Sequence, residues 1–350
     1  MSKSKYYSVP YISNSTLTWF KVSPKYCWKR MNREIADLET SYSFLGTQLH
    51  LSLLEPEEFE KTYTYLDFKT PTSKQQLGFC ESVIKQASLG EFMQEIAMIE
   101  AYKENYVTEK MTDAGILKAA EKIYEQNSEY IKYLAIRRDY REVLSKSRKE
   151  LITTVTNAIK SHKKANRLMI SPKDIETHNE FAIYWEYPIS YEGNCVKCKS
   201  LIDRLVVDHQ TKKVTIVDLK TTSVLGDMTS TLDDRNYYRQ LAFYRLAVQH
   251  SNLFPKDYEI DAYIVAVNTQ DPFECRVYKL SSEEYVKQVQ VINNIMKELS
   301  WHWFTNQWDY SRAYYEGDGT ENLTDEYSNE SIEGDTDNGD DTLRFTDAVL

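Results

Sequence analysis

Two charged residues stand two positions apart in the apolar segment VTIVDLKTT. Because side chains alternate along a strand, Asp218 and Lys220 would project from one face after Ile216, with Val217 and Leu219 on the other face. A buried carboxylate and ammonium are costly unless each has a charged partner or a metal ion. Taken alone, this spacing is most often a surface ion pair at the end of a strand.

A second acid lies in the preceding segment KCKSLIDRLVV, where Asp203 interrupts a mainly apolar run. If the two segments pair as neighbouring strands, Asp203 and Asp218 meet at one point. Close carboxylates repel each other, and a divalent cation makes their joint ionisation favourable. Mg²⁺ or Mn²⁺ suits such oxygen ligands and would activate water for hydrolysis of a phosphodiester, while Lys220 orients that water or stabilises the developing charge.

The patterning also indicates the elements that must position these residues. Short β-rich runs bounded by turn residues, and later apolar residues at helical spacing, predict three neighbouring antiparallel strands, a helix, two strands and a last helix. The expected ranges are 180–189, 196–207, 213–222, about 237–248, 260–267, 275–280 and 282–304. This order implies an α/β fold with a mixed central β-sheet flanked by helices.

Helices are expected ahead of the sheet. A short one should follow Ser13 and Asn14 and end before Pro24, and a second over 43–54 carries His50. Residues 73–164 are polar with apolar residues at three- and four-residue intervals, which predicts a helical subdomain. We therefore divide the chain into an N-terminal helical part of the core, an inserted helical subdomain, a catalytic core and an acidic tail, over residues 1–72, 73–170, 171–315 and 316–350.

The net charge of −10 is a property of the chain's end. Residues 316–350 carry twelve acids and one base, so the remainder has a net charge of +1. A near-neutral body can still hold a basic groove, because phosphate affinity depends on local clusters of lysine and arginine. We expect the tail to be disordered. The most basic stretch, 137–164, is equally compatible with a DNA channel and a solvated helical face.

Five cysteines form an odd, scattered set, so free thiols are expected rather than disulfides. Cys195 and Cys198 have zinc-like spacing, but no second pair completes four ligands, so packing at a strand end is the better interpretation. The sequence has neither an apolar run of roughly eighteen residues nor a signal peptide. We therefore expect a cytoplasmic protein without membrane contact.

Several separated segments together resemble a known family, the PD-(D/E)XK nucleases, and within it the RecE-like phage exonucleases. The resemblance spans about residues 11–250 and is carried, in order, by YISNSTLTWFKVSPKYC, GTQLH, NEFAIYW, KCKSLID, VDLKTT and QLAFY. It implies a restriction-endonuclease-like core. Some relatives hold an iron–sulfur cluster through three late cysteines, but only Cys275 follows Tyr244 here, so no cluster is expected.

The resemblance also implies roles for individual residues. It makes Lys220 the catalytic lysine, gives Glu180 a role in supporting the metal or the attacking water, and lets Gln240 and Tyr244 position DNA or the lysine. Glu186 lies on the same strand face as Glu180 and is an alternative to it. Considered alone, the histidine, glutamine and tyrosine would more often be structural. The implied metal ligands are His50, Asp203, Asp218 and the backbone carbonyl of Leu219.

The implied activity is Mg²⁺- or Mn²⁺-dependent exonuclease cleavage of double-stranded DNA from an end, 5′ to 3′. The single strand left behind would serve a single-strand annealing protein in phage-type recombination or repair, and the active form would be a homo-oligomeric ring. Two alternatives stay open. One is an endonuclease or single-strand-specific nuclease of the same superfamily, and the other is a non-catalytic DNA-binding protein of the same fold.

Overall fold

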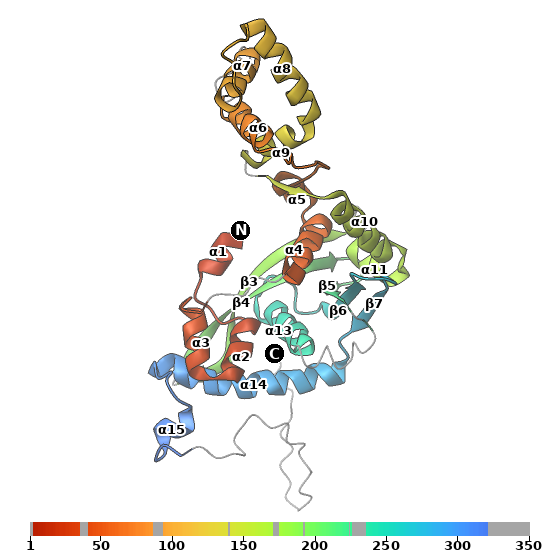
Figure 1. Ribbon diagram of the computed structural model, residues 1–350. Coiled ribbons are helices and arrows are strands. Elements are labelled where there is room, and N and C mark those ends of the chain that lie inside the picture. The colour runs from red at the N-terminus through yellow and green to blue at the C-terminus, as the bar shows by residue number, and fades with distance from the viewer. Residues whose placement is uncertain are drawn as a thin grey trace, which may run out of the picture.

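Five strands form one mixed sheet in the computed structural model. It describes residues 3–35, 41–86, 94–138, 141–170, 175–191, 193–223, 225 and 236–320. The strand order is β3-β4-β5-β6-β7, over Glu176–Tyr191, Asn194–Asp208, Lys213–Thr222, Glu259–Asn268 and Cys275–Lys279. Neighbours are antiparallel except β5 and β6, which are parallel. The predicted mixed sheet with three consecutive antiparallel strands is confirmed (Figure 1).

Helices α13 (Tyr237–His250) and α14 (Ser282–Thr305) pack against the sheet and build the main core. The parallel pairing of β5 and β6 requires a crossover, and α13 supplies it. Its buried residues include Leu241 and Phe243, which share a core with Ile216 of β5. These helices form where helical periodicity predicts them, since their apolar residues face the strands.

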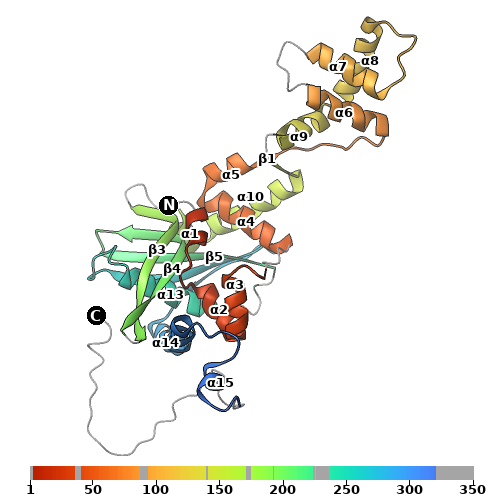
Figure 2. The same cartoon turned by 90° about the vertical axis from the view of Figure 1, so that its left-hand side faces the viewer.

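The N-terminal helices close the same core. Helix α2 (Asn14–Val22) begins at a capping box formed by Ser13 and Thr16, so the predicted short helix is confirmed. Helix α3 (Pro24–Met31) follows directly, with the Ser23 hydroxyl accepting from the N–H of Tyr26. The preceding six-residue helix α1 (Lys3–Ser8) lies beside the β3–β4 ribbon in both Figure 1 and Figure 2.

A second core lies between the sheet and the helices α4 (Ser41–Leu54), α10 (Lys146–Ser161) and α11 (Lys163–Met169). Leu49 of α4 packs there with Val217 and Leu219 of β5. Burial of these residues fixes α4, and therefore His50, against the strand that carries Asp218 and Lys220.

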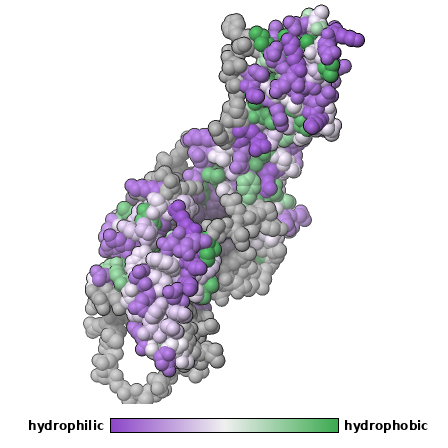
Figure 3. Space-filling view, turned by 60° about the vertical axis from the view of Figure 1, so that its left-hand side comes forward, coloured by the Kyte–Doolittle hydropathy of each residue, from purple (hydrophilic) through white to green (hydrophobic). Residues whose placement is uncertain are grey.

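Helices α6 to α9 form a separate helical module with its own core. Their bounds are Lys74–Gln86, Gln94–Asn105, Asp113–Gln126 and Ser128–Arg138. Figures 1 and 2 show the module standing away from the sheet, and its visible surface in Figure 3 is mainly hydrophilic. It joins the body through α5 (Pro56–Thr62) and a two-stranded parallel ladder of β1 (Tyr63–Tyr65) and β2 (Glu142–Leu144).

The packing of the helices ends the helical module earlier in the chain than the sequence analysis predicted. The helical subdomain was expected to extend to residue 170, but Ile152, Val155 and Ile159 of α10 pack into the core beneath the sheet. The helical pattern runs continuously past residue 140, so periodicity alone does not reveal where the packing partner changes.

The described chain closes with α15 (Arg312–Glu316) and ends at residue 320. The rest of the acidic tail, for which disorder was expected, lies outside the described residues. Among the helices described, none is both long and apolar enough to cross a membrane.

Candidate active site

The two central strands separate at the predicted acids. Backbone pairing of β4 with β5 runs from Asp208–Lys213 to Arg204–Val217. Just beyond this last pair, the Asp203 side chain reaches across, and its Oδ2 accepts the backbone N–H of Leu219 at 2.8 Å. The carboxylate of β4 is therefore fixed against the backbone of β5, one residue from Asp218.

Asp218 is buried, with only 1% of its side chain exposed, and its Oδ2 lies 2.7 Å from Lys220 Nζ. Val217 and Leu219 pack into the opposite core, as strand alternation predicted. The other carboxylate oxygen, Oδ1, has no hydrogen-bond partner among the residues that the structure describes. Burial raises the pKa of Asp218 to about 6, because the attraction of Lys220 only partly offsets desolvation and the repulsion of Asp203.

Lys220 is held as a cation. Burial acts to lower the pKa of its ammonium, but the attraction of Asp218 and Asp203 outweighs burial and raises the pKa above its ordinary value. Its Nζ also lies 4.9 Å from the ring centroid of Tyr237, which is a cation–π distance. The ammonium is thus bracketed by carboxylates and an aromatic ring.

Glu180 reaches the cluster from β3 through an unusual backbone conformation. Its neighbours pair as Asn179–Arg204 and Phe181–Ile202, which places Glu180 opposite Asp203 in the register. Its φ of 49° lies in the left-handed region, which costs a residue with a Cβ about 1–2 kcal/mol. Such strain concentrates at functional sites.

The alternative to Glu180 lies elsewhere. Glu186 is exposed and pairs across the ribbon with Lys197, six residues further along β3. Of the two glutamates, it is Glu180 that the structure brings to the carboxylates.

His50 completes the cluster from α4. Its Nε2 lies 2.8 Å from the carbonyl oxygen of Leu219, and its Nδ1 lies 3.7 Å from Asp203 Oδ2. Potential ligand atoms of His50, Glu180 and Asp203 all lie within 4.8 Å of one another. His50 thus lies beside two acids that follow it by more than a hundred positions in sequence.

Two features keep α4 close to β5, so that His50 lies at the cluster. A Cβ at Gly46 would lie 3.2 Å from Thr221 Oγ1, so glycine permits the close approach of α4 to β5. At the helix end, Asn179 Nδ2 donates to the Leu54 carbonyl at 2.7 Å. The Asn179 side-chain oxygen in turn accepts from the buried Arg204 guanidinium at 2.8 Å.

Gln240 and Tyr244 lie on one face of α13. Gln240 Nε2 donates to the Tyr244 hydroxyl at 2.8 Å. Burial raises the pKa of Tyr244 well above its ordinary value, and the nearby charges of Asp218 and Asp203 add to the effect. Tyr244 therefore stays neutral, and the pair forms an uncharged wall beside the two acids.

The comparison with protein families agrees with this geometry. A family model described as the PD-(D/E)XK nuclease superfamily matches residues 84–313, more than half of the chain. The chain belongs to the PD-(D/E)XK nuclease superfamily.

Two solved structures are also similar to this superfamily member. An inferred exonuclease from Eubacterium rectale matches at 13% identity over 80% of this chain and 91% of its own, with a TM-score of 0.36. SSO0001 matches at 13% identity over 73% of this chain and 85% of its own, with a TM-score of 0.26. A comparison with curated protein sequences finds no match. The superfamily assignment rests on the family model.

Enzymes of the superfamily use a divalent metal, and the residues of the cluster suit one. The cluster offers carboxylates, a backbone carbonyl and one imidazole, a donor set that suits Mg²⁺ and Mn²⁺. The strongest sign is the buried Oδ1 of Asp218, because a buried carboxylate oxygen without a partner costs free energy that a cation would recover. The chemistry of the site therefore fits the metal.

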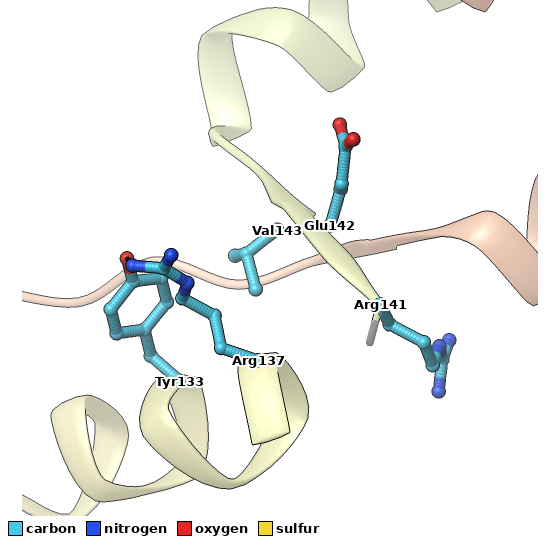
Figure 4. Close-up of a pocket in the computed structure, with 5 residues that line it drawn as sticks. All are labelled: Tyr133, Arg137, Arg141, Glu142 and Val143. Carbon is cyan, nitrogen blue, oxygen red and sulfur yellow. Dashed lines mark hydrogen bonds between the residues drawn. The ribbon is translucent and has the colours of Figure 1, made fainter. Parts of the chain in front are cut away.

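Two other sequence features lie apart from this candidate site. Cys195 is exposed and Cys198 is buried, and both are free thiols. The basic stretch contributes Arg137 and Arg141 to a pocket of about 320 Å³ at the foot of the helical module. Figure 4 shows the Arg137 guanidinium over the Tyr133 ring, to whose hydroxyl it donates at 3.1 Å, while Arg141 points away. None of the predicted site residues lines this pocket.

Sequence reasoning missed Tyr237, Gly46 and Asn179. Tyr237 stands three residues before Gln240 on the same helix, so its helical spacing was an available signal. Gly46 lies inside the motif GTQLH, where a glycine in a helix is unfavourable unless a close contact requires it. Nothing local marked Asn179, because its role depends on a contact with a helix over a hundred residues earlier.

Proposed function

We propose that this chain is a metal-dependent DNA exonuclease that hydrolyses phosphodiester bonds of double-stranded DNA from an end, in the 5′ to 3′ direction. The observation that carries the proposal is the convergence of His50, Glu180 and Asp203 within 4.8 Å, beside the buried pair of Asp218 and Lys220. A cluster of potential metal ligands next to a charged lysine can bind the metal, orient the attacking water and stabilise the charge that develops in phosphodiester hydrolysis.

Each residue has a defined part in this proposal. His50, Asp203, Asp218 and the Leu219 carbonyl would hold Mg²⁺ or Mn²⁺, which when bound supplies Lewis acidity and a water of lowered pKa. Glu180 would orient the attacking water and take its proton. As the water oxygen bonds to phosphorus and the P–O3′ bond breaks, Lys220 would donate to the phosphate oxygen on which charge develops, and the departing O3′ would take a proton from solvent.

The surrounding residues would position the substrate. The neutral pair of Gln240 and Tyr244 would contact DNA or fix Lys220, and the aromatic ring of Tyr237 would hold the ammonium in place. An uncharged wall beside two acids limits the repulsion that an incoming phosphate meets.

The resemblance to RecE-like enzymes supports the finer parts of the proposal. Digestion of one strand would leave a single strand for an annealing protein in phage-type recombination or repair. A homo-oligomeric ring would keep the enzyme on its substrate, and a purely monomeric sedimentation profile at micromolar concentration would argue against that ring.

The test compares end-labelled linear duplex with covalently closed circular DNA, each with Mg²⁺ or with EDTA. Metal-dependent loss of linear ends, with circles intact, is expected for the exonuclease. Cleavage of circles would identify an endonuclease, digestion of a single-stranded substrate alone would identify a single-strand-specific nuclease, and no metal-dependent cleavage would leave a DNA-binding protein.

A matched pair of variants separates catalysis from folding in the same assay. Lys220→Met should abolish cleavage. Lys213→Met removes a lysine from the other end of β5, where its Nζ lies 2.6 Å from the buried Asp261. This control should lower stability but leave the cleavage rate of the folded protein unchanged. Equal activity of the two variants would refute the role of Lys220.

A further inference from the structure

Helix α1 lies beside β3 and β4 at one edge of the body (Figures 1 and 2), and tyrosines and lysines of this region form a strip there. It has no part in the chemistry described above. We call it the tyrosine–lysine strip and define it as Tyr6, Tyr7, Tyr11, Tyr184, Lys197 and Lys199.

Direct contacts hold the strip together. Lys199 Nζ donates to the backbone carbonyls of Tyr6 at 3.0 Å and Val9 at 2.6 Å, and it lies 4.8 Å from the Tyr6 ring centroid. The Tyr184 ring packs against Tyr6 and Tyr11, with centroid separations of 6.4 and 6.0 Å. The N-terminal segment is therefore fastened to the ribbon by aromatic and cationic groups.

Within the described parts of the chain, the ammonium groups of Lys197 and Lys199 lie over aromatic rings rather than in ion pairs. Lys197 Nζ is 5.9 Å from the Tyr11 ring centroid. Tyr184 stands opposite Lys199 in the ladder, and Glu186 stands opposite Lys197. Glu186 is the acid that faces the strip from β3, and it does not offset both lysines.

The strip leads to the candidate active site. Lys199 precedes Asp203 by four residues on β4, about 13 Å along an extended strand. Tyr6 also lies near the inner wall of the site: burial raises the pKa of Tyr244, and Tyr6 is among the neighbouring groups that add to that shift. A polymer seated on the strip would therefore lie within reach of the carboxylates.

The strip's outer side is exposed and positively charged. Tyr7 is 61% exposed. The exposed cations Lys5, Arg33 and Lys197 lie on or beside it, and the Arg33 guanidinium donates to the Tyr7 carbonyl at 3.4 Å. An exposed aromatic ring beside lysines and arginines, as at Tyr7, suits unpaired nucleic acid, because a base can stack on the ring while the cations contact phosphates.

We propose that the tyrosine–lysine strip binds an unpaired strand of the nucleic acid as that strand enters or leaves the active site. The inference rests on the proposed nuclease function and adds a substrate-handling surface to it. A single strand is the ligand rather than a duplex, because a duplex buries its base faces and could offer the strip only its phosphates.

The test measures binding rather than cleavage. Fluorescence anisotropy would follow a labelled oligothymidine strand and a duplex of the same length in EDTA, with wild type, Tyr7→Ala and Lys197→Ala. Tyr7→Ala should weaken single-strand affinity about tenfold and duplex affinity less than about twofold. Lys197→Ala should weaken single-strand binding about threefold and lower its salt dependence by about one phosphate contact.

Matched controls come from the far end of the chain. Tyr310 is 51% exposed next to α15, and Lys287 is exposed on α14, so Tyr310→Ala and Lys287→Ala should leave both affinities unchanged. Any of three results would overturn the proposal that the strip binds a single strand. These are unaltered single-strand binding in both strip variants, an equal loss of affinity for strand and duplex, and the absence of single-strand binding by wild type. Metal-dependent cleavage by wild type would still stand in those cases, so the two proposals fail separately.

Discussion

The buried carboxyl of Asp218 makes the stability of the metal-free protein depend on pH in a defined way. Burial raises the pKa of Asp218 from its ordinary value of 3.8 to about 6. A difference of about two pKa units corresponds to roughly 3 kcal/mol. Ionisation of the Asp218 side chain therefore lowers the free energy of unfolding by roughly this amount.

The sign follows from proton binding in the two states. Below about pH 4 the carboxyl is largely protonated in both the folded and unfolded chains, so ionisation costs the fold nothing. Between about pH 4 and pH 6 the unfolded chain releases the proton while the folded chain retains it, so stability falls as the pH rises. Above that window the loss is complete.

Asp218→Asn isolates this effect, because the amide has nearly the same shape and does not ionise. Urea unfolding in EDTA, followed by circular dichroism, would be compared at about pH 4.5 and about pH 7. From about pH 4.5 to about pH 7, the free energy of unfolding of the variant should rise by about 2 kcal/mol relative to that of wild type. Lys220 keeps its charge throughout, because its pKa is raised, and its attraction for the ionised carboxylate is already contained in the Asp218 pKa of about 6.

Asp261→Asn provides the control from the same sheet. Asp261 is also buried, but Lys213 and Lys279 lie 2.6 and 2.7 Å from its oxygens. Burial alone would raise the pKa of Asp261, yet its hydrogen bonds with the lysines outweigh burial and lower it. The stability lost in this variant should stay nearly constant from about pH 4.5 to pH 7 and shrink only at lower pH. A pH-independent difference for Asp218→Asn would refute the account of a desolvated carboxyl.

Three further predictions concern the supports of the site. Gly46→Ala should weaken Mn²⁺ affinity about tenfold by calorimetry, because the new Cβ meets Thr221 and displaces His50, and adding Thr221→Ala should restore affinity. Tyr237→Leu should lower the single-turnover cleavage rate about fivefold with little change in KM, since it removes the cation–π contact of Lys220; an altered KM at constant rate would contradict this. Lys213→Met should cost about 2 kcal/mol in urea unfolding, and no loss of stability would show that Lys279 alone satisfies Asp261.

Local patterns in the sequence predicted much of the sheet and the placement of two residues of the candidate site. Alternation along β5 separates Asp218 and Lys220 from Val217 and Leu219, and the structure shows the same division. The order of strands and helices follows from short-range periodicity and turn residues, so the mixed sheet could be expected. His50 and Glu180 entered only through resemblance to a family, because nothing near them in sequence marks them as candidate ligands.

Long-range geometry could not be predicted. The separation of β4 from β5, which lets Asp203 bond to the Leu219 backbone, depends on where the ladder ends. The left-handed backbone of Glu180 leaves no pattern in the sequence. Strands β1 and β2 are three residues each and pair across the whole helical module, so neither has enough periodicity to stand out from its helical surroundings.

The backbone of Glu180 has a consequence for how this protein would respond to selection. Asparagine tolerates φ near 50° better than glutamate does, so replacement at this position would relieve about 1 kcal/mol of strain while removing a carboxylate from the cluster. Variants selected only for heat resistance would therefore accumulate substitutions at Glu180 and lose cleavage activity. Their yield as folded protein would not reveal this loss. Engineering of a more robust variant would need an activity filter at this position from the first round.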